Sequence, residues 1–311
     1  MRKCYQTFYQ KLCSTATDIQ QLQKSLVSAA ARTANCCRCV STTRPLLQNS
    51  RFPKTEPLHE VTTVDSEEAL ADAVRPHFDQ QQPLVVRNAL SISNKNTNTM
   101  KNLQDWNYLE ELVDFHTDCH IEIGGNYSKS QIADVPFVEF PSFMKFFEER
   151  YGKRLEGNNE PDPPQELIYL AQNDIFPELL EIIDIPSLCN NLGEGKLYST
   201  MIWIGPYGCI SPLHFDPLDN ILMQFVGEKK VFLCPYNAQV YAGSDGNQPN
   251  TSPLDPEADM SNDIVQMYPS IQDITFGVAT LKAGDALYIP KKWYHYVRTV
   301  ETSVSINTWF R

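Results

Sequence analysis

The second half of the chain consists of short β-type runs separated by turn residues, and this pattern constrains the fold more than any other feature. The turns include Gly205-Pro206-Tyr207-Gly208, Gly227-Glu228 and Ala283-Gly284-Asp285. Many short strands at such spacing predict a β-sandwich or a β-barrel from residue 166 to the end. The runs lie at residues 168–170, 199–204, 221–226, 230–233, 279–281, 286–289, 294–298 and 303–309.

Helical signals are more prominent in residues 56–165. Ser66 precedes a run at helical spacing with acidic residues in its first turn, as at a helix start. Residues 140–151 predict an amphipathic helix whose phenylalanines face inward. Residues 237–276 are polar and interrupt the β-rich region, and loops of this length are usually functional or mobile. We therefore expect a helix-rich part at 56–165 and a β core at 166–311 with a long insertion.

The charge of the chain is distributed unevenly. The 311 residues carry a net charge of −12, from 26 basic and 38 acidic side chains. Residues 1–55 contain nine basic side chains and one acidic side chain, so their +8 leaves −20 on the remainder. This acidic body argues against a general nucleic-acid binder, which needs a basic surface to meet phosphates. No apolar run reaches the roughly 18 residues of a membrane span.

Residues 1–55 form a basic segment that we expect to be disordered or to act as a targeting signal. Ile19, Leu22, Leu26 and Ala30 would share one face of a helix. With the abundant Arg, Ser and Thr residues, this resembles a mitochondrial transit peptide, although many disordered N-termini have a similar composition. The nine cysteines, an odd number at irregular spacings, favour a reducing intracellular setting over a disulfide framework.

Three side chains of the β-rich region form a candidate metal site. His214-Phe215-Asp216 follows a glycine-rich turn, and residues i and i+2 of an extended backbone point to the same face. His295 lies in a late strand-like run, which in a double-sheet roll can return beside an early strand. Two histidines and one carboxylate are the ligand set of non-haem Fe(II) oxygenases. A surface turn with a buried, hydrogen-bonded His295 explains these residues about as well, because His-x-Asp is a common pattern.

Lys229 favours the metal-site interpretation. It follows the run 221–226 across a tight turn and alternates with Val231 and Leu233, which places it on the apolar face of its strand. An inward-facing cation there would meet the distal carboxylate of a dicarboxylate ligand. Its neighbour Lys230 is expected to point outward.

These segments together resemble the JmjC family of Fe(II)- and 2-oxoglutarate-dependent oxygenases, over roughly residues 60–311. The motifs are Trp203-x-Gly205-Pro206-x-Gly208-x-x-Ser211-Pro212-Leu213-His214-x-Asp216-Pro217-x-x-Asn220, Gly227-x-Lys229 and Gly284-Asp285-x-Leu287-x-Ile289-Pro290-x-x-Trp293-Tyr294-His295. Similarity to the branch of JmjC domain-containing protein 5, or lysine-specific demethylase 8, lies in Tyr169-Leu170-Ala171-Gln172, Glu122-x-Gly124-x-x-Tyr127 and His295-Tyr296-Val297-Arg298. The resemblance implies a mainly β fold with flanking helices, a double-stranded β-helix of the cupin or jelly-roll type.

The resemblance also implies roles for individual residues. The catalytic centre would bind Fe(II) through His214, Asp216 and His295. The 2-oxoglutarate cosubstrate would be held by Tyr169, Ser211, Asn220, Lys229, Asn307 and Trp309. The substrate pocket would include Glu122 and Tyr127. Asn307-Thr308-Trp309-Phe310 departs from that branch, which has a Ser and two Trp residues at its end. Core packing of Tyr169 and Trp309, and a solvated edge-strand pair of Glu122 and Tyr127, are alternatives that the sequence leaves open.

Membership of this family would mean that Fe(II), 2-oxoglutarate and O2 together oxidise a protein side chain. We expect hydroxylation of a basic arginyl or lysyl residue in a protein or peptide partner, because the acidic body suits a basic segment. Demethylation of N-methyl-lysine is the alternative. A catalytically silent cupin-fold binding scaffold and a zinc cupin enzyme are alternatives from other classes. The resemblance implies an intracellular location in nucleus or cytoplasm and is compatible with a homodimer; the basic N-terminus makes the mitochondrial matrix the alternative location.

Overall fold

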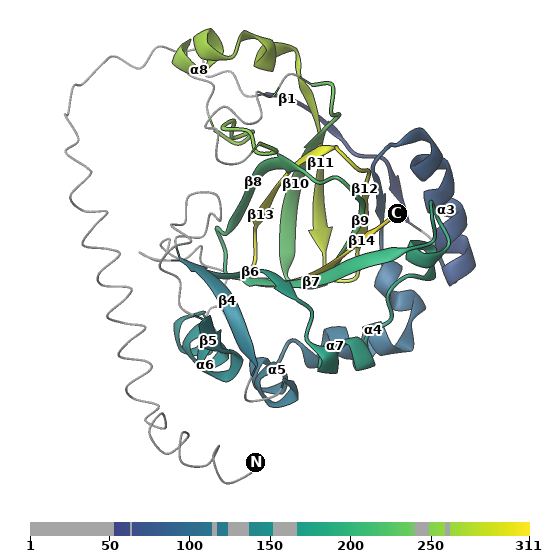
Figure 1. The fold of residues 1–311 in the computed structure, drawn as a ribbon, viewed down its shortest axis with the longest axis vertical. Helices are drawn as coiled ribbons and strands as arrows, with labels where there is room; N and C mark the ends of the chain where they lie inside the picture. The colour runs from purple at the N-terminus through teal and green to yellow at the C-terminus, as the bar shows by residue number, and fades with distance from the viewer. Residues whose placement is uncertain are drawn as a thin grey trace, which may run out of the picture.

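Two β-sheets face each other and form the body of the protein (Figure 1). The computed structural model describes residues 53–62, 64–113, 117–123, 137–151, 167–238, 240, 249–258 and 262–311. The five-stranded sheet has the spatial order β1 (Lys54–Pro57), β11 (Thr275–Lys282), β10 (Glu228–Cys234), β13 (Tyr294–Thr299) and β8 (Ile210–Phe215). The nine-stranded sheet has the order β2 (Glu60–Val61), β3 (Leu84–Val86), β12 (Ala286–Ile289), β9 (Asp219–Val226), β14 (Ser303–Phe310), β7 (Leu197–Gly205), β6 (Ile168–Asp174), β4 (Asp118–Ile123) and β5 (Phe137–Glu139).

The strands from β7 to β14 follow the path of a double-stranded β-helix. Successive strands change sheet, except for β10 and β11, which both belong to the five-stranded sheet and lie on either side of the insertion. The mainly β fold with flanking helices that the sequence predicts is therefore confirmed. In this path the early strand β8 pairs with the late strand β13 in antiparallel fashion. That pairing brings together residues about 80 positions apart.

Helices cover the outer face of the nine-stranded sheet. They are α3 (Glu67–Gln80), α4 (Asn94–Asn102), α5 (Trp106–Leu112), α6 (Phe140–Tyr151) and α7 (Pro177–Ile182), with short 3-10 turns at Ala89–Ile92 and Ser187–Asn190. Ser66 caps α3 as expected, because its side chain accepts a hydrogen bond from the Ala69 amide. The predicted inward phenylalanines of α6, Phe143, Phe146 and Phe147, are buried in the largest apolar cluster of the described residues. None of the helices in the described ranges is long and apolar enough to cross a membrane.

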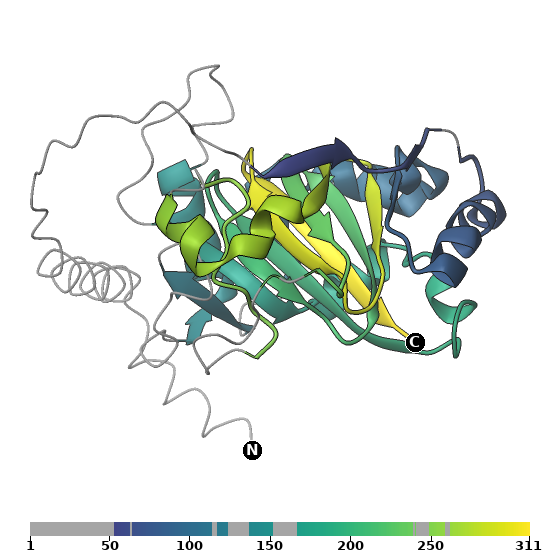
Figure 2. The ribbon, with the colours of Figure 1, turned by 90° about the horizontal axis from the view of Figure 1, so that it is seen from above.

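The described part of the insertion is packed rather than extended into solvent. It contains α8 (Asn262–Met267) and a 3-10 turn at Pro269–Asp273, and α8 lies on the other side of the barrel from α3 (Figure 2). Buried apolar side chains of this segment, such as Val240, Leu254 and Ile271, pack in one cluster with Phe232 and Tyr296 of the five-stranded sheet. The insertion also ends earlier than residue 276, because β11 already begins at Thr275.

Several predictions from the sequence fall on residues outside the described ranges. These are nearly all of the basic segment at 1–55, the substrate-pocket residue Tyr127 and the polar loop at residues 152–165. They remain predictions.

Gly227 forms the turn that delivers Lys229 to its strand, and this turn requires glycine. Its φ is +70°, and an added Cβ would collide with the carbonyl oxygen of Thr302. We expect Gly227→Ala to destabilise the protein by about 2 kcal/mol or more, since backbone strain and the clash add. The measurement is the urea midpoint of unfolding. Gly284→Ala is the matched control, because Gly284 also has a positive φ, +100°, but an added Cβ would make only ordinary van der Waals contacts, the nearest at 3.7 Å to the Asn88 side chain. An equal loss in both variants would contradict a role for the clash.

Candidate active site

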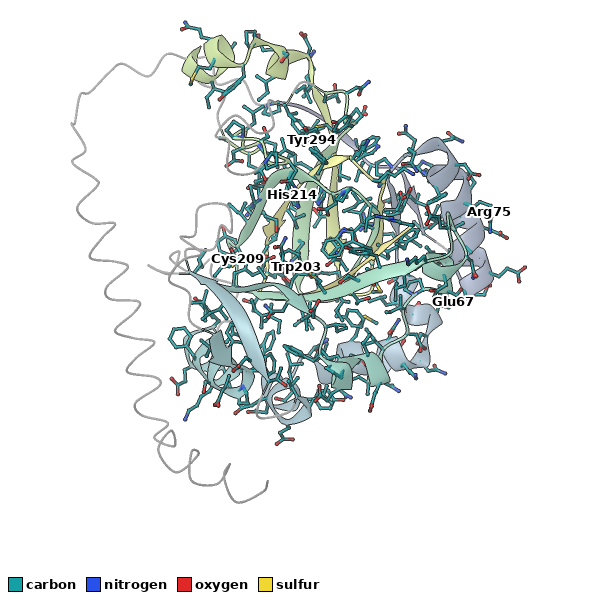
Figure 3. The ribbon with its side chains drawn as sticks, viewed as in Figure 1. Glu67, Arg75, Trp203, Cys209, His214 and Tyr294 are labelled. Carbon is teal, nitrogen blue, oxygen red and sulfur yellow. The ribbon has the colours of Figure 1, made fainter. Side chains whose placement is uncertain are left out.

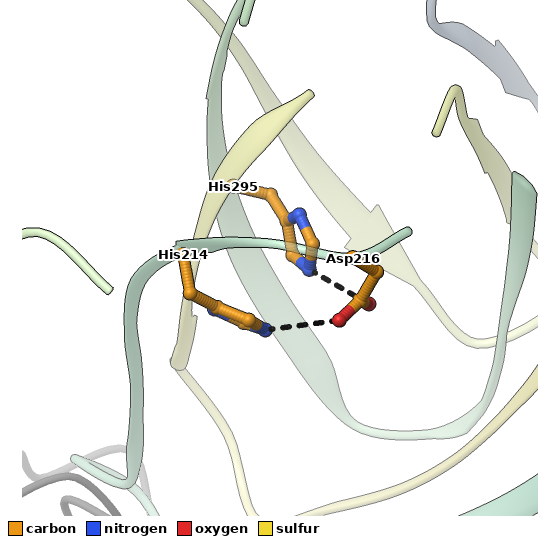
Figure 4. Close-up of side chains that lie close together, drawn as sticks. All are labelled: His214, Asp216 and His295. Carbon is orange, nitrogen blue, oxygen red and sulfur yellow. Dashed lines mark ion pairs between the residues drawn. The ribbon is translucent and has the colours of Figure 1, made fainter. Parts of the chain in front are cut away.

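Three potential metal ligands converge between the two sheets. His214 and His295 are direct cross-strand neighbours on β8 and β13, and their ring centroids lie 4.2 Å apart. Asp216 follows the last residue of β8 and turns its carboxylate toward both rings (Figure 4). One ligand atom of each residue lies within 4.8 Å of the others. Figure 3 shows His214 and Trp203 in the space between the sheets, whereas Glu67 and Arg75 lie on the outer helix α3.

Backbone carbonyl groups orient both imidazole rings. Nδ1 of His214 lies 2.7 Å from the Pro212 oxygen, and Nδ1 of His295 lies 3.0 Å from the Trp293 oxygen. A carbonyl oxygen only accepts, so Nδ1 carries the proton in both rings. Nε2 is then the ligand atom of each ring. The Nε2 atom of His214 lies 4.0 Å from Oδ1 of Asp216, and the Nε2 atom of His295 lies 3.6 Å from Oδ2 of Asp216. Backbone partners of this kind fix the tautomer of metal-binding histidines.

Burial keeps His295 neutral at physiological pH. Desolvation, and secondly the neighbouring His214, lower the pKa of His295 to about 4, although Asp216 acts in the opposite direction. A neutral imidazole is the form that binds a metal ion. The indole N–H of Trp309 donates to Oδ2 of Asp216 at 3.0 Å, which orients the carboxylate.

A cavity beside the three ligands contains all nine residues that the sequence predicts for metal and cosubstrate binding. Six of them come from the cosubstrate set. The nine are Tyr169, Ser211, His214, Asp216, Asn220, Lys229, His295, Asn307 and Trp309. Five further residues line the same cavity, and these are Gln172, Trp203, Leu222, Ile289 and Val297. The strands that carry the nine residues are β6, β8, β9, β10, β13 and β14, together with the turn after β8.

Lys229 is a buried cation at the inner end of this cavity. Only 2% of the residue is exposed, and no carboxylate pairs with its ammonium group in the ranges that the structure describes. The ammonium lies 5.8 Å from the ring centre of Tyr169 and 6.0 Å from that of Trp203. Burial lowers the pKa of Lys229 to about 8. An unpaired charge in such a place is costly, so the site favours an anion that would restore the charged form.

Comparison with known proteins gives the family. The profile of the Cupin-like domain matches residues 71–311. The chain is 32% identical over 249 residues to "Lysine-specific demethylase JMJ30" of Arabidopsis thaliana, which covers 78% of this chain and 53% of that protein. It is 29% identical over 285 residues to "Jumonji C domain-containing protein 5" of Drosophila melanogaster, covering 85% of this chain and 64% of that protein.

The chain belongs to the cupin-like JmjC family of 2-oxoglutarate-dependent oxygenases. "Lysine-specific demethylase 8" of Xenopus tropicalis is 37% identical over 149 residues, which cover 46% of this chain and 32% of that protein. The chain therefore spans between about a third and two thirds of the length of these three relatives.

Polar contacts in the cavity beside the three metal ligands, which we call the JmjC cavity, connect the predicted cosubstrate residues. Tyr169 is 2% exposed, and its side chain hydrogen-bonds with Ser211. Desolvation raises the pKa of Tyr169, so its hydroxyl keeps its proton. The amide of Asn307 donates to Asn220 Oδ1 at 3.2 Å and accepts from Trp203 Nε1 at 2.7 Å. The hydrogen bond to Ser211 gives the Tyr169 hydroxyl a polar partner in the cavity, which core packing, the alternative for Tyr169, does not require.

Of the five cavity residues that were not among the predicted site residues, two have polar side chains, Trp203 and Gln172, and both lie in motifs of the resemblance. Trp203 bonds to Asn307 and packs against Tyr169. Gln172 has a φ of +53° where the register between β6 and β7 shifts. Nothing in the alternation of a strand reveals such a bulge, so apart from its motif only the backbone geometry could identify Gln172.

Of the two predicted substrate residues, the structure describes only Glu122. It is 4% exposed and sits opposite Tyr169 in the pairing of β4 with β6. Directly opposed residues of antiparallel strands point to the same face of a sheet, so Glu122 shares the face of Tyr169. Its burial argues against the solvated edge-strand pair. Glu122 does not itself line the metal cavity but lies beside it.

Proposed function

We propose that this protein is an Fe(II)- and 2-oxoglutarate-dependent hydroxylase that oxidises a basic, arginyl or lysyl, side chain of a protein. The observation that carries this proposal is one cavity that combines His214, Asp216 and His295 with the unpaired buried cation Lys229. A metal alone does not need this cation. A metal together with a dicarboxylate does.

The residues present suit these groups. Two imidazole Nε2 atoms and one carboxylate form the two-histidine, one-carboxylate set that binds iron and leaves further positions open. Lys229 would hold the distal carboxylate of 2-oxoglutarate, with the Tyr169 hydroxyl as a second donor. Ser211 of the five-stranded sheet and Asn220 and Asn307 of the nine-stranded sheet offer further polar groups in the same cavity.

Iron(II) with 2-oxoglutarate and O2 would supply the oxidising power to insert oxygen into a C–H bond, with succinate and CO2 as coproducts. The protein's own residues bind and orient. His214 and His295 are held by the Pro212 and Trp293 carbonyls, Asp216 is held by Trp309, and the apolar walls Leu222, Ile289 and Val297 limit water in the cavity.

Glu122 and the net charge support a basic substrate. Residues 56–311 carry −20, which favours association with a basic segment. Glu122 places a buried carboxylate on the face of Tyr169, next to the cavity. A carboxylate at that point is suited to a guanidinium or ammonium group. The names of the relatives favour the second candidate, demethylation of N-methyl-lysine, since two of them are called lysine-specific demethylases.

Anaerobic reconstitution with Fe(II) and 2-oxoglutarate, followed by O2 and a library of basic peptides, tests the proposal. We expect succinate and a peptide that has gained one oxygen atom. Loss of a methylene unit from a methylated peptide would instead support demethylation. Absence of succinate with every peptide would contradict the oxygenase activity. The remaining candidates would then be a catalytically silent cupin-fold binding scaffold or a zinc cupin enzyme.

Glu122→Gln tests the substrate role within the same assay. We expect peptide-dependent turnover to fall at least about tenfold, because a charge-assisted hydrogen bond contributes about 1.5–3 kcal/mol. Peptide-independent conversion of 2-oxoglutarate should remain. Glu111→Gln, on the exposed face of α5, is the control that should behave as wild type. Equal peptide turnover in both variants would argue against Glu122 as a substrate residue.

Our proposals for location and assembly come from the resemblance and, for the mitochondrial alternative, from the basic N-terminus. We propose an intracellular protein of nucleus or cytoplasm, with the mitochondrial matrix as alternative, and a homodimer as a state to test by light scattering.

A further inference from the structure

The strand that carries His214 lies at the edge of the five-stranded sheet, and part of the insertion covers this edge. Within the described residues, β8 pairs with β13 on one side only. On its other side the Phe215 amide donates to the Asn250 carbonyl at 3.1 Å, and the Ser252 amide donates to the Leu213 carbonyl at 2.7 Å. Thr251 forms a bridge with His214 itself. The segment 249–258, which we call the strap, therefore holds β8 on both sides of a metal ligand.

Side chains strengthen this end of the strap. The Asn250 amide donates to the Phe215 carbonyl at 2.9 Å. The Ser252 hydroxyl bonds to the Val240 carbonyl and accepts from the Leu254 amide. Thr251, Ser252 and Leu254 are buried. The contacts are thus those of a β-bridge supported by side-chain hydrogen bonds and by buried side chains, rather than of a loop that rests on the surface.

Glu257 anchors the other end of the strap to two strands. Its carboxylate accepts from Arg298 through Nε and, at 3.1 Å, through a terminal nitrogen, from Lys230 Nζ at 3.1 Å and from the Tyr296 hydroxyl at 3.2 Å. Burial would raise the pKa of Glu257, but the hydrogen bonds from Arg298 and Lys230 outweigh it and hold this pKa below its usual value. Glu257 is therefore an anion at neutral pH.

The carboxylate of Glu257 balances the positive charges of Lys230 and Arg298. Lys230 and Arg298 are directly opposite each other in the pairing of β10 with β13. Like charges at such positions repel, and only a shared counter-ion makes the pair favourable. Because Arg298 and Tyr296 lie on β13, which also carries His295, Glu257 connects the strap to the strand of the third ligand. One segment of ten residues thus contacts both ligand-bearing strands.

We propose that the strap positions the metal centre and that Glu257 is its positioning residue: it keeps β8, with His214 and Asp216, in register against His295. This proposal rests on the proposed function, since it presumes a metal at these three residues. Neither Glu257 nor Asn250 lines the cavity, so their effect acts through the backbone of β8 and β13. Length alone predicted that the insertion is functional or mobile, and this role would make its function specific.

Titration of the full-length, metal-free protein with Co(II) tests this proposal, with the visible d–d absorption as the readout. We expect Glu257→Gln and Asn250→Ala each to bind Co(II) about tenfold more weakly than wild type, as for other residues that orient metal ligands, and to show an altered d–d spectrum. Glu60→Gln is the matched control. It removes an ion pair with Arg87, 2.7 Å long and also partly exposed, at a distance from the metal cavity. This variant should bind Co(II) as wild type does.

The outcomes separate the two proposals. Wild-type Co(II) affinity and spectrum in both strap variants would overturn the positioning role, even if their thermal midpoints fall. If Glu257→Gln does not fold, Asn250→Ala decides alone, because it removes only the two hydrogen bonds of this side chain, to the Phe215 carbonyl and from the Thr251 hydroxyl, and keeps the backbone contacts. Failure of the wild type to bind Co(II) would overturn the metal centre of the proposed function, and the positioning role with it.

Discussion

Replacing His214 with alanine is expected to abolish oxidation of any peptide substrate and to reduce bound iron to background. The imidazole is one of three ligands, and its Nε2 faces Asp216 across the site. Loss of a metal ligand removes the several kcal/mol of activation that the metal provides, so we expect turnover to fall more than about a thousandfold. Succinate formation and iron content per chain are the measurements.

His59→Ala serves as the matched control for this substitution. His59 stacks on His77, with ring centroids 4.9 Å apart, and takes no part in the metal cavity. We expect its iron content and turnover to equal those of wild type. Unchanged turnover in His214→Ala would show that the metal assignment is wrong.

Lys229→Met is expected to weaken 2-oxoglutarate binding at least about thirtyfold while metal binding is retained. Methionine has a similar volume but no charge, so the variant removes the cation from the buried end of the cavity. Truncating one partner of a buried charge pair typically costs about 2–5 kcal/mol of binding free energy. Calorimetric titration with 2-oxoglutarate in the presence of Mn(II) measures the change. Lys282→Met, at the exposed end of β11, should bind normally.

The same lysine predicts how cosubstrate affinity depends on pH. In the ligand-free protein the pKa of Lys229 is about 8, and a bound carboxylate would favour the charged form. Binding then takes up a proton above this pKa, so affinity should fall by up to about tenfold per pH unit as the pH rises beyond 8. Below that pH Lys229 is already charged, so binding takes up no proton and the affinity should be nearly independent of pH. Lys229→Met should lose this dependence, and an identical slope in both proteins would assign it to another group.

The alternation of residues along a strand correctly predicted the orientations of Lys229 and Lys230. Lys229, Val231 and Leu233 share a face in the sequence pattern, and all three are buried in the structure. Lys230 was expected to face outward, and it does, with its side chain bonded to Glu257. Because the side chains of a strand alternate strictly, this part of the arrangement follows from local sequence.

The pairing of strands that are far apart in the chain could not be predicted from the spacing of the residues alone. The spacing of His214 and Asp216 predicts that both face one side, but not that His295 lies opposite His214. That depends on the pairing of β8 with β13, which the order of the strands in the two sheets decides. Beforehand, a double-sheet roll made this pairing possible, and the resemblance to the JmjC family implied it.

The insertion is a case in which polar composition predicted a long insertion but did not show how it packs. Most of its residues are polar, yet a few apolar side chains such as Leu254 and Ile271 suffice to bury it against the five-stranded sheet. Residues with no recognisable motif, Asn250 and Glu257, then form the contacts beside His214 and Arg298. Hydrogen bonds between segments so far apart in the chain leave no periodic signal.

The sequence by itself determined most strands of the β-rich half, the orientation of the lysine pair and the types of the three ligands, because each follows from neighbours within a few residues. The tertiary structure decided which strands lie side by side, and so the distances between ligands, the unpaired burial of Lys229 and the role of the strap. The physical reason is that burial and strand pairing depend on the packing of distant segments, which local alternation does not encode.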